Sequence, residues 1–158
     1  MRRWIFGLAT VAILVAMNLM IVQKEGVLRS GTRMYLRLAP RDPRSLMQGD
    51  YMALNYEITN QFRRDPPRKD GHLVVTLDAN GIATFVRFHD GTPLAAGERL
   101  LRYRSRGQVR LGAESFFFQE GHAARYEAAR YGELRVAPSG DSVLVGIADD
   151  KLRHLGPR

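Results

Sequence analysis

The chain has 158 residues, of which 45% are hydrophobic and 25% charged, and it carries a formal net charge of +8. This is the length of one domain, and the composition is too apolar for a disordered chain. Because the chain has no cysteine, disulfide frameworks, thiolate metal sites, iron–sulfur clusters and thiol nucleophiles are excluded.

An apolar run without formal charge, Trp4 to Val22, follows the short basic start formed by residues 1–3. Nineteen helical residues span about 28 Å, close to the roughly 30 Å hydrocarbon core of a bilayer. Ten of the nineteen are Leu, Ile, Val or Phe, and the strongly polar Asn18 lies near the far end. We therefore expect residues 4–22 to form a transmembrane helix in contact with the lipid bilayer.

The length of this run favours an uncleaved signal anchor over a cleaved signal peptide. It exceeds the usual apolar core of a signal peptide, and no Ala-x-Ala cleavage site follows it. Arg2 and Arg3 favour a cytoplasmic N-terminus, residues 1–3, although the basic residues after the helix oppose this under the positive-inside rule. Long domains translocate largely regardless of charge, so we expect residues 24–158 to be extracytoplasmic and anchored to the membrane.

Two segments alternate apolar and polar residues with the period of half-buried β-strands, Thr32 to Ala39 and Tyr51 to Ile58. In the first segment, Tyr35 has the outward parity. In the second, Leu54 and Tyr56 have the inward parity.

Turn signals further along the chain predict two hairpins and one helix. Asp78-Ala79-Asn80-Gly81 and Pro138-Ser139-Gly140-Asp141 each separate two apolar segments, as in β-hairpins. Ala113 to Gln119, with three consecutive phenylalanines, suits a strand covered on both faces, and the alanine-rich segment His122 to Tyr131 predicts a helix. We expect an α+β fold that is mainly β: a transmembrane helix, then a small curled antiparallel sheet or partial barrel with one short helix.

The sequence does not indicate a metal or a cofactor. The histidines, at positions 72, 89, 122 and 154, show no ligand spacing such as His-x-His. Glu120 and His122 could supply two ligands, but a helix start explains this pair equally well. We therefore assign no metal and no cofactor.

Catalytic residues are also not assigned, and we lean toward a protein that is not an enzyme. Asp50, Glu114 and Glu120 are acidic residues beside apolar strands, where a raised pKa could make one of them a general acid. Capping of a turn by Asp50 and of a helix start by Glu120 is the better explanation. The segment before Asp50 faintly resembles serine peptidases of the signal-peptidase and LexA type, but Ser45 lies at the wrong offset and no lysine is well placed as a base.

Arginines dominate the positive charge, and Arg102, Arg104 and Arg106 would share one face of a strand. The simplest interpretation is a solvated strand face. The next is contact with anionic lipid headgroups, worth about 1 kcal/mol for each basic residue near the surface. Charge alone permits nucleic-acid binding, but we do not expect it for an outward-facing domain on a membrane.

One segment matches a spaced family pattern, G-D-Y-x-x-L-x-Y, at every fixed position: Gly49, Asp50, Tyr51, Leu54 and Tyr56. Residues 42–46 and 117–121 are similar to the other blocks of the same family. The chain thus resembles the GDYXXLXY family of uncharacterised bacterial membrane-anchored proteins. The resemblance implies an N-terminal anchor in a bacterial inner membrane, a periplasmic domain and no established activity. The polytopic membrane proteins often encoded beside such genes imply a membrane partner.

Two classes of function are compatible with the sequence. The leading hypothesis is a single-pass membrane-anchored protein whose extracytoplasmic β-rich domain binds or stabilises a partner membrane protein. The alternative is an envelope hydrolase or ligand-binding enzyme that uses Asp50 and Glu120, in a cleft completed by Tyr51. The position of the two carboxyl groups relative to a pocket separates these hypotheses.

Overall fold

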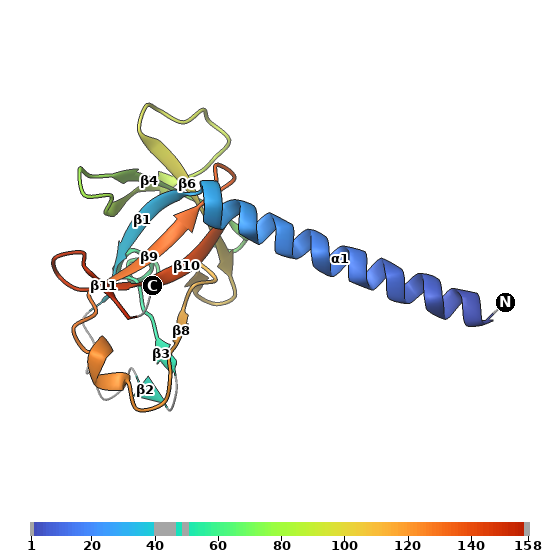
Figure 1. The fold of residues 1–158 in the computed structure, drawn as a ribbon. Helices are drawn as coiled ribbons and strands as arrows, with labels where there is room; N and C mark the ends of the chain where they lie inside the picture. The colour runs from blue at the N-terminus through green and yellow to red at the C-terminus, as the bar shows by residue number, and fades with distance from the viewer. Residues whose placement is uncertain (1, 40–46, 49–50, 157–158) are drawn as a thin grey trace.

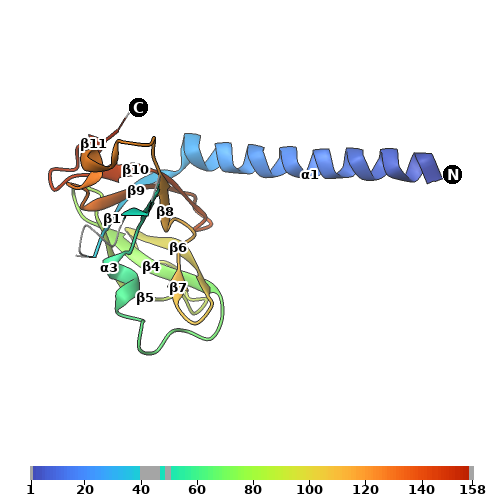
Figure 2. The same cartoon turned by 90° about the horizontal axis from the view of Figure 1, so that it is seen from below.

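The computed structural model describes residues 2–39, 47–48 and 51–156 of the chain (Figure 1). One long helix, α1 (Arg2–Ser30), projects from a domain built mainly of strands (Figures 1 and 2). The expected α+β fold, with an apolar N-terminal helix followed by curled antiparallel sheets, is confirmed.

The described side chains in the apolar run of α1 are all exposed, and no other element of the described residues covers them. It is long and apolar enough to cross a membrane between Phe6 and Ser30. The helix extends eight residues beyond Val22, the predicted end, so the polar residues that follow the apolar run are helical as well. An ion pair of 3.1 Å between Arg29 and Glu25, spaced i and i+4, supports this last part.

The described strands form three antiparallel sheets. The first sheet has the order β1 (Thr32–Arg37), β9 (Tyr131–Val136), β10 (Ser142–Ala148), β11 (His154–Leu155). The second has the order β2 (Met47–Gln48), β3 (Tyr51–Ala53), β8 (Ser115–Phe117). The third has the order β5 (Ala83–Phe88), β4 (Gly71–Leu77), β6 (Glu98–Ser105), β7 (Val109–Arg110). Both predicted hairpins are present, as β4–β5 and β9–β10.

The three sheets curl around one apolar core. Isolated bridges between Tyr35 and Ile82 and between Leu38 and Tyr56 join neighbouring sheets where the ladders end. Fully buried side chains come from all three sheets: Met34, Leu36, Met52, Leu73, Leu101, Leu134 and Ile147. Residues far apart in the chain therefore share one core.

The strand predicted over Tyr51 to Ile58 is shorter than expected, because β3 ends at Ala53. The backbone N–H of Leu54 still donates to Glu114 O, but the chain then leaves this sheet and reaches Leu38 of the next one. A one-turn helix, α3 (Glu57–Asn60), follows. The inward direction predicted for alternate residues is nevertheless confirmed for Met52, Leu54 and Tyr56, which are all buried.

The helix predicted over His122 to Tyr131 is only a short 3₁₀ turn, η1 (Ala123–Tyr126). Backbone hydrogen bonds of Arg130, just after this turn, explain why the helix is short. Arg130 donates its N–H to Ala148 O and accepts at its carbonyl from Leu38 N, so the chain joins the first sheet before a longer helix can form.

Two predictions about burial were wrong. The phenylalanine run is not covered on both faces, because β8 is an edge strand and Phe117 is exposed. Tyr35, predicted to face outward, is buried in a second small cluster with Tyr131 and Ala148. The first sheet is therefore partly covered on its outer face as well.

Candidate functional site

The described residues of the GDYXXLXY motif contribute buried side chains to the core rather than reactive groups. Leu54 and Tyr56, two of its fixed positions, are almost completely buried in the main core. Tyr51 is half-buried, and its ring lies 5.8 Å from that of Phe117 on β8. Gly49 and Asp50 lie outside the described residues, so the predicted turn cap at Asp50 stays a prediction.

Tyr56 joins three parts of the domain through one side chain. Its hydroxyl donates a hydrogen bond to the carbonyl of Ala113, on the segment that leads into β8. Its ring lies against the backbone of Gly132 on β9. Burial, with the nearby negative charge of Glu114, raises the pKa of Tyr56 above the ordinary range of tyrosine. The hydroxyl therefore remains a protonated donor, which is a structural role.

The acidic residues predicted as candidate general acids lie in different surroundings. The carboxylate of Glu114 accepts the backbone N–H groups of Leu111 and Gly112, so it caps a turn. Glu120 is exposed and lines none of the hollows described below. Because Asp50 is outside the described residues, its distance from Glu120 is not defined, and the cleft of Asp50, Tyr51 and Glu120 remains a prediction.

A pair that the sequence analysis missed is Glu133 on β9 and His154 on β11. The Glu133 carboxylate is buried, at 7% residue exposure, and lies 3.2 Å from His154 Nδ1 and 3.1 Å from Arg33 Nε. Gly146 on β10 leaves room for the imidazole, because a Cβ at that position would collide with His154 Cε1. The two residues are 21 positions apart, and no local spacing in the sequence could have indicated their contact.

This pair borders a basic hollow of about 730 Å³. Arg135 and Arg153 also line it, and both are engaged: Arg135 donates to Gly31 O and Arg153 to the Asp149 carboxylate. Glu133 can orient the imidazole as a carboxylate does in catalytic triads. The described lining contains no serine, threonine or cysteine, so this pair lacks the nucleophile that such chemistry needs.

Aromatic side chains surround a second hollow, of about 600 Å³, which we call the aromatic hollow. Its lining includes Phe116, Phe117, Phe118, Tyr126, Val145 and Leu155. The Tyr126 ring lies 5.2 Å from that of Phe116 and 5.1 Å from that of Phe118, in geometries that favour aromatic packing. Val145 remains 40% exposed at this site. Such a surface is suited to an apolar group of another molecule.

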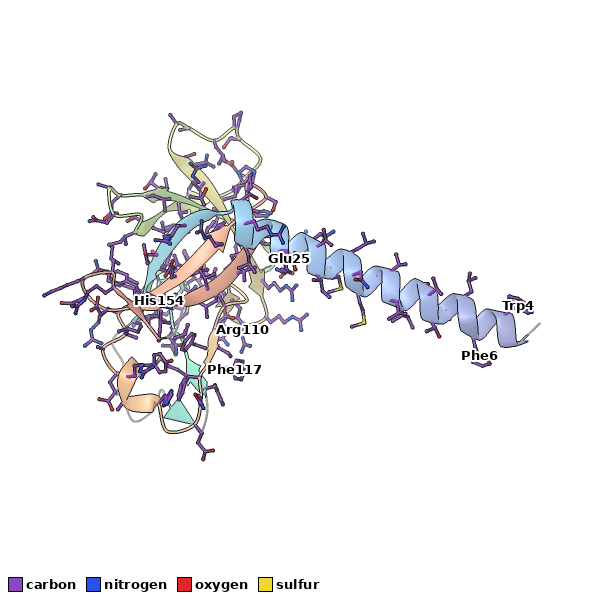
Figure 3. The ribbon with its side chains drawn as sticks, viewed as in Figure 1. Trp4, Phe6, Glu25, Arg110, Phe117 and His154 are labelled. Atoms are coloured by element: carbon purple, nitrogen blue, oxygen red, sulfur yellow. The ribbon has the colours of Figure 1, made fainter. Side chains whose placement is uncertain are left out.

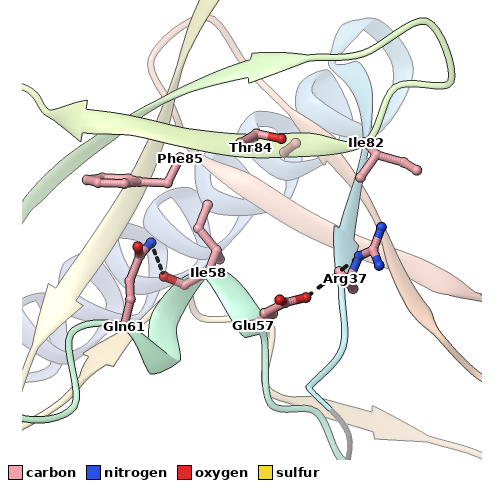
Figure 4. Close-up of a pocket in the computed structure, with 8 residues that line it drawn as sticks. Arg37, Glu57, Ile58, Gln61, Ile82, Thr84 and Phe85 are labelled. Atoms are coloured by element: carbon pink, nitrogen blue, oxygen red, sulfur yellow. Dashed lines mark hydrogen bonds and ion pairs between the residues drawn. The ribbon is translucent and has the colours of Figure 1, made fainter.

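Two further hollows are more polar. One, of about 340 Å³, has the motif residues from Ala53 to Tyr56 in one wall and Arg63 and Arg110 in its lining. The other, of about 370 Å³, lies between α3 and β5 and is bordered by the ion pair of Arg37 and Glu57, 3.6 Å apart (Figure 4). Within the described part of the chain, no group of three or more His, Asp and Glu side chains is arranged to hold a metal ion.

Fold and site together define a small, mainly β domain carried on a candidate membrane helix. The family model described as GDYXXLXY protein matches residues 13–147, and the chain belongs to this family of uncharacterised proteins. No curated protein and no solved structure matches the chain significantly.

Proposed function

We propose that the chain is a single-pass protein of the bacterial inner membrane whose periplasmic domain binds or stabilises a polytopic partner membrane protein. Residues 1–3 lie in the cytoplasm, residues 4–22 span the bilayer, and residues 24–158 form the periplasmic domain. The partner is bound at the aromatic hollow.

The side chains of α1 support the membrane assignment. All those described between Trp4 and Val22 are exposed, with no apolar surface of the domain to cover them. Its polar groups are satisfied within the helix: Thr10 Oγ1 donates to Phe6 O and Asn18 Nδ2 to Leu14 O, both at 2.9 Å. Internal satisfaction of polar groups is the condition that a bilayer imposes on a spanning segment.

The observation that carries the proposal is the junction between α1 and the domain. A single residue, Gly31, separates the last residue of α1 from the first residue of β1. A Cβ on Gly31 would collide with Val27 O and lie 3.0 Å from Val136 N, and Arg135 donates to Gly31 O at 3.0 Å. A junction this tight holds the domain close to the bilayer, where it can reach a membrane protein but not a distant soluble one.

The aromatic hollow supplies the binding surface. Exposed apolar surface of this kind marks interaction sites in soluble domains. The hollow is formed by β8, η1, β10 and β11, and β8 and η1 lie together on one side of the domain (Figure 1). The proposal does not require a reactive group, which agrees with the structural roles of Tyr56 and Glu114.

The binding surface can be tested with a matched pair of variants in the full chain. Val145 in the hollow and Val86 on β5 are similarly exposed, at 40% and 45%. Each is replaced by aspartate, and stoichiometric partners are measured after purification from solubilised membranes. We expect Val145→Asp to lose a polytopic partner that the native chain and Val86→Asp retain. Equal retention by both variants, or no stoichiometric partner for the native chain, would contradict the proposal.

Orientation requires a separate test. Protease added to intact spheroplasts should digest the domain while the cytoplasm stays sealed. A domain that remains protected until the inner membrane is broken would reverse the proposed topology.

A further inference from the structure

Phe117 is the most exposed large apolar side chain of the described domain, at 73%. It occupies an edge strand, and its ring lies 5.8 Å from the ring of Tyr51. The flanking Phe116 and Phe118 instead turn toward Tyr126 and the core. Phe117 thus lies at the edge of the aromatic hollow with most of its ring exposed, and the packing of the domain does not explain this exposure.

The position of Phe117 relative to α1 indicates what it meets. Figure 3 shows Phe117 on the flank of the domain that faces the direction in which α1 leaves it. The helix continues for eight residues between Val22 and Ser30, about 12 Å at 1.5 Å per residue. A headgroup layer is roughly 5 to 8 Å thick, as the difference between total and hydrocarbon thickness implies. With the apolar run in the bilayer, the domain therefore begins near the outer edge of the headgroups, and the flank that faces along α1 is the part nearest to them.

The neighbours of Phe117 suit a lipid surface. Tyrosine is enriched at the membrane interface, because its ring is apolar and its hydroxyl polar. Arg110 lies on the same flank (Figure 3), and among the described residues it has no acidic partner, its guanidinium lying 2.7 Å from the side-chain amide of Gln108. A guanidinium without a carboxylate partner is free to bind lipid phosphates.

We propose that Phe117 inserts into the interfacial region of the bilayer and gives the domain a second attachment to the membrane that already holds α1. The occupant is the lipid surface, because α1 places a bilayer beside this flank. The partner proposed above then contacts the rest of the aromatic hollow, away from Phe117. Three side chains then contact the membrane. The Phe117 ring enters the acyl boundary, the Tyr51 ring lies at its edge, and Arg110 pairs with a lipid phosphate.

Tryptophan fluorescence in the purified full chain tests this directly, because Trp4 is the chain's one tryptophan. Two variants are made in a Trp4→Phe background, Phe117→Trp and Val86→Trp. Each is placed in nanodiscs of phosphatidylcholine and phosphatidylglycerol, with and without bromine on the acyl chains. Val86 is the matched control, since it is exposed on β5, which lies away from α1 (Figure 2).

We expect brominated lipid to reduce the Phe117→Trp emission at least twofold and to leave the Val86→Trp emission unchanged. Emission from Phe117→Trp that is as insensitive to bromine as that of the control would overturn the proposal. So would a blue shift of the Phe117→Trp emission that appears only after membrane extract is added and is not accompanied by quenching by bromine, because this would identify a protein as the occupant. No partner is present in the nanodiscs, so the result does not depend on the partner proposed above.

Discussion

The Tyr56 ring lies so close to the backbone of Gly132 that a Cβ there would be 2.8 Å from Tyr56 Cε1 and 3.1 Å from its hydroxyl oxygen. Tyr56 is the last fixed position of the family motif, and Gly132 is the second residue of β9, paired with Leu36 and Ile147. The Tyr56 side chain of the motif therefore packs in the space that Gly132 leaves in the first sheet. Packing alone explains why this position carries a large aromatic residue.

Replacement of Gly132 by alanine should destabilise the domain by about 1 to 3 kcal/mol, the usual cost of overpacking a filled core. Both the Tyr56 ring and β9 are held by the core and cannot move aside without losing other contacts. Denaturation by urea, followed by circular dichroism, measures the change. Gly26→Ala is the control, because no atom lies within 4 Å of a Cβ there and alanine favours helix. Equal stability of Gly132→Ala and the native chain would show that Tyr56 has room to move.

Tyr56→Phe should cost about 1 to 3 kcal/mol near neutral pH, because the buried carbonyl of Ala113 loses its donor. The cost should shrink in alkali. The folded protein keeps Tyr56 protonated because its pKa is raised, whereas the unfolded chain ionises near 10.0. Stability from this group is therefore complete below pH 10 and is lost above it, by about 1.4 kcal/mol per pH unit. Urea denaturation of both proteins at pH 8 and pH 11 measures the difference, and a gap that does not narrow would contradict this account.

The sequence predicted the elements whose pattern is local. The apolar run became α1, both hairpins formed at their turn residues, and Met52, Leu54 and Tyr56 point inward as their alternation indicates. It failed where tertiary pairing competes with local preference. The alanine-rich segment after His122 stays a short 3₁₀ turn, because Arg130 is needed in the first sheet.

The candidate site was less predictable for the same reason. Glu133 and His154 meet because β11 pairs with β10 and because Gly146 leaves room for the imidazole. Phe117 is exposed because β8 lies at an edge of its sheet, which a run of three phenylalanines does not reveal. The charge and spacing of individual residues cannot give such contacts when they depend on sheet order.

Gly146→Ala should displace His154 from Glu133, because a Cβ would collide with the imidazole. We expect a lower thermal midpoint and a changed His154 resonance in NMR spectra. The double variant Gly146→Ala/His154→Ala separates this cause from others, since removing the imidazole should relieve most of the effect of the alanine. If alanine at 146 costs as much with His154 absent as with it present, the collision is not the cause.

Asp149→Asn should reduce stability at pH 7 and matter progressively less in acid. The carboxylate of Asp149 accepts hydrogen bonds from Arg153 Nε at 2.7 Å and from the backbone N–H groups of Lys151 and Arg153, both at 2.9 Å. The bond from the Arg153 side chain, foremost, holds the pKa of Asp149 below its ordinary value of 3.8. Its stabilisation is therefore present above that value and is lost as the pH falls through the lower, folded-state pKa.

Urea denaturation at pH 7 and pH 2.5 compares Asp149→Asn with the native chain. Asp65→Asn is the control, because Asp65 is exposed and has no hydrogen bond within the described residues. A stability loss for Asp149→Asn that is as large at pH 2.5 as at pH 7 would show that charge is not involved.

The central claim is that α1 stays in the bilayer and tethers the domain there. Its most direct test is mass spectrometry of the mature protein, recovered from cells after membranes are washed with alkaline carbonate. We predict a chain that still carries α1, found in the washed membranes. A soluble product that begins after the apolar run would show that α1 is a cleaved leader, and the proposed anchoring, partner and lipid contact would all be contradicted.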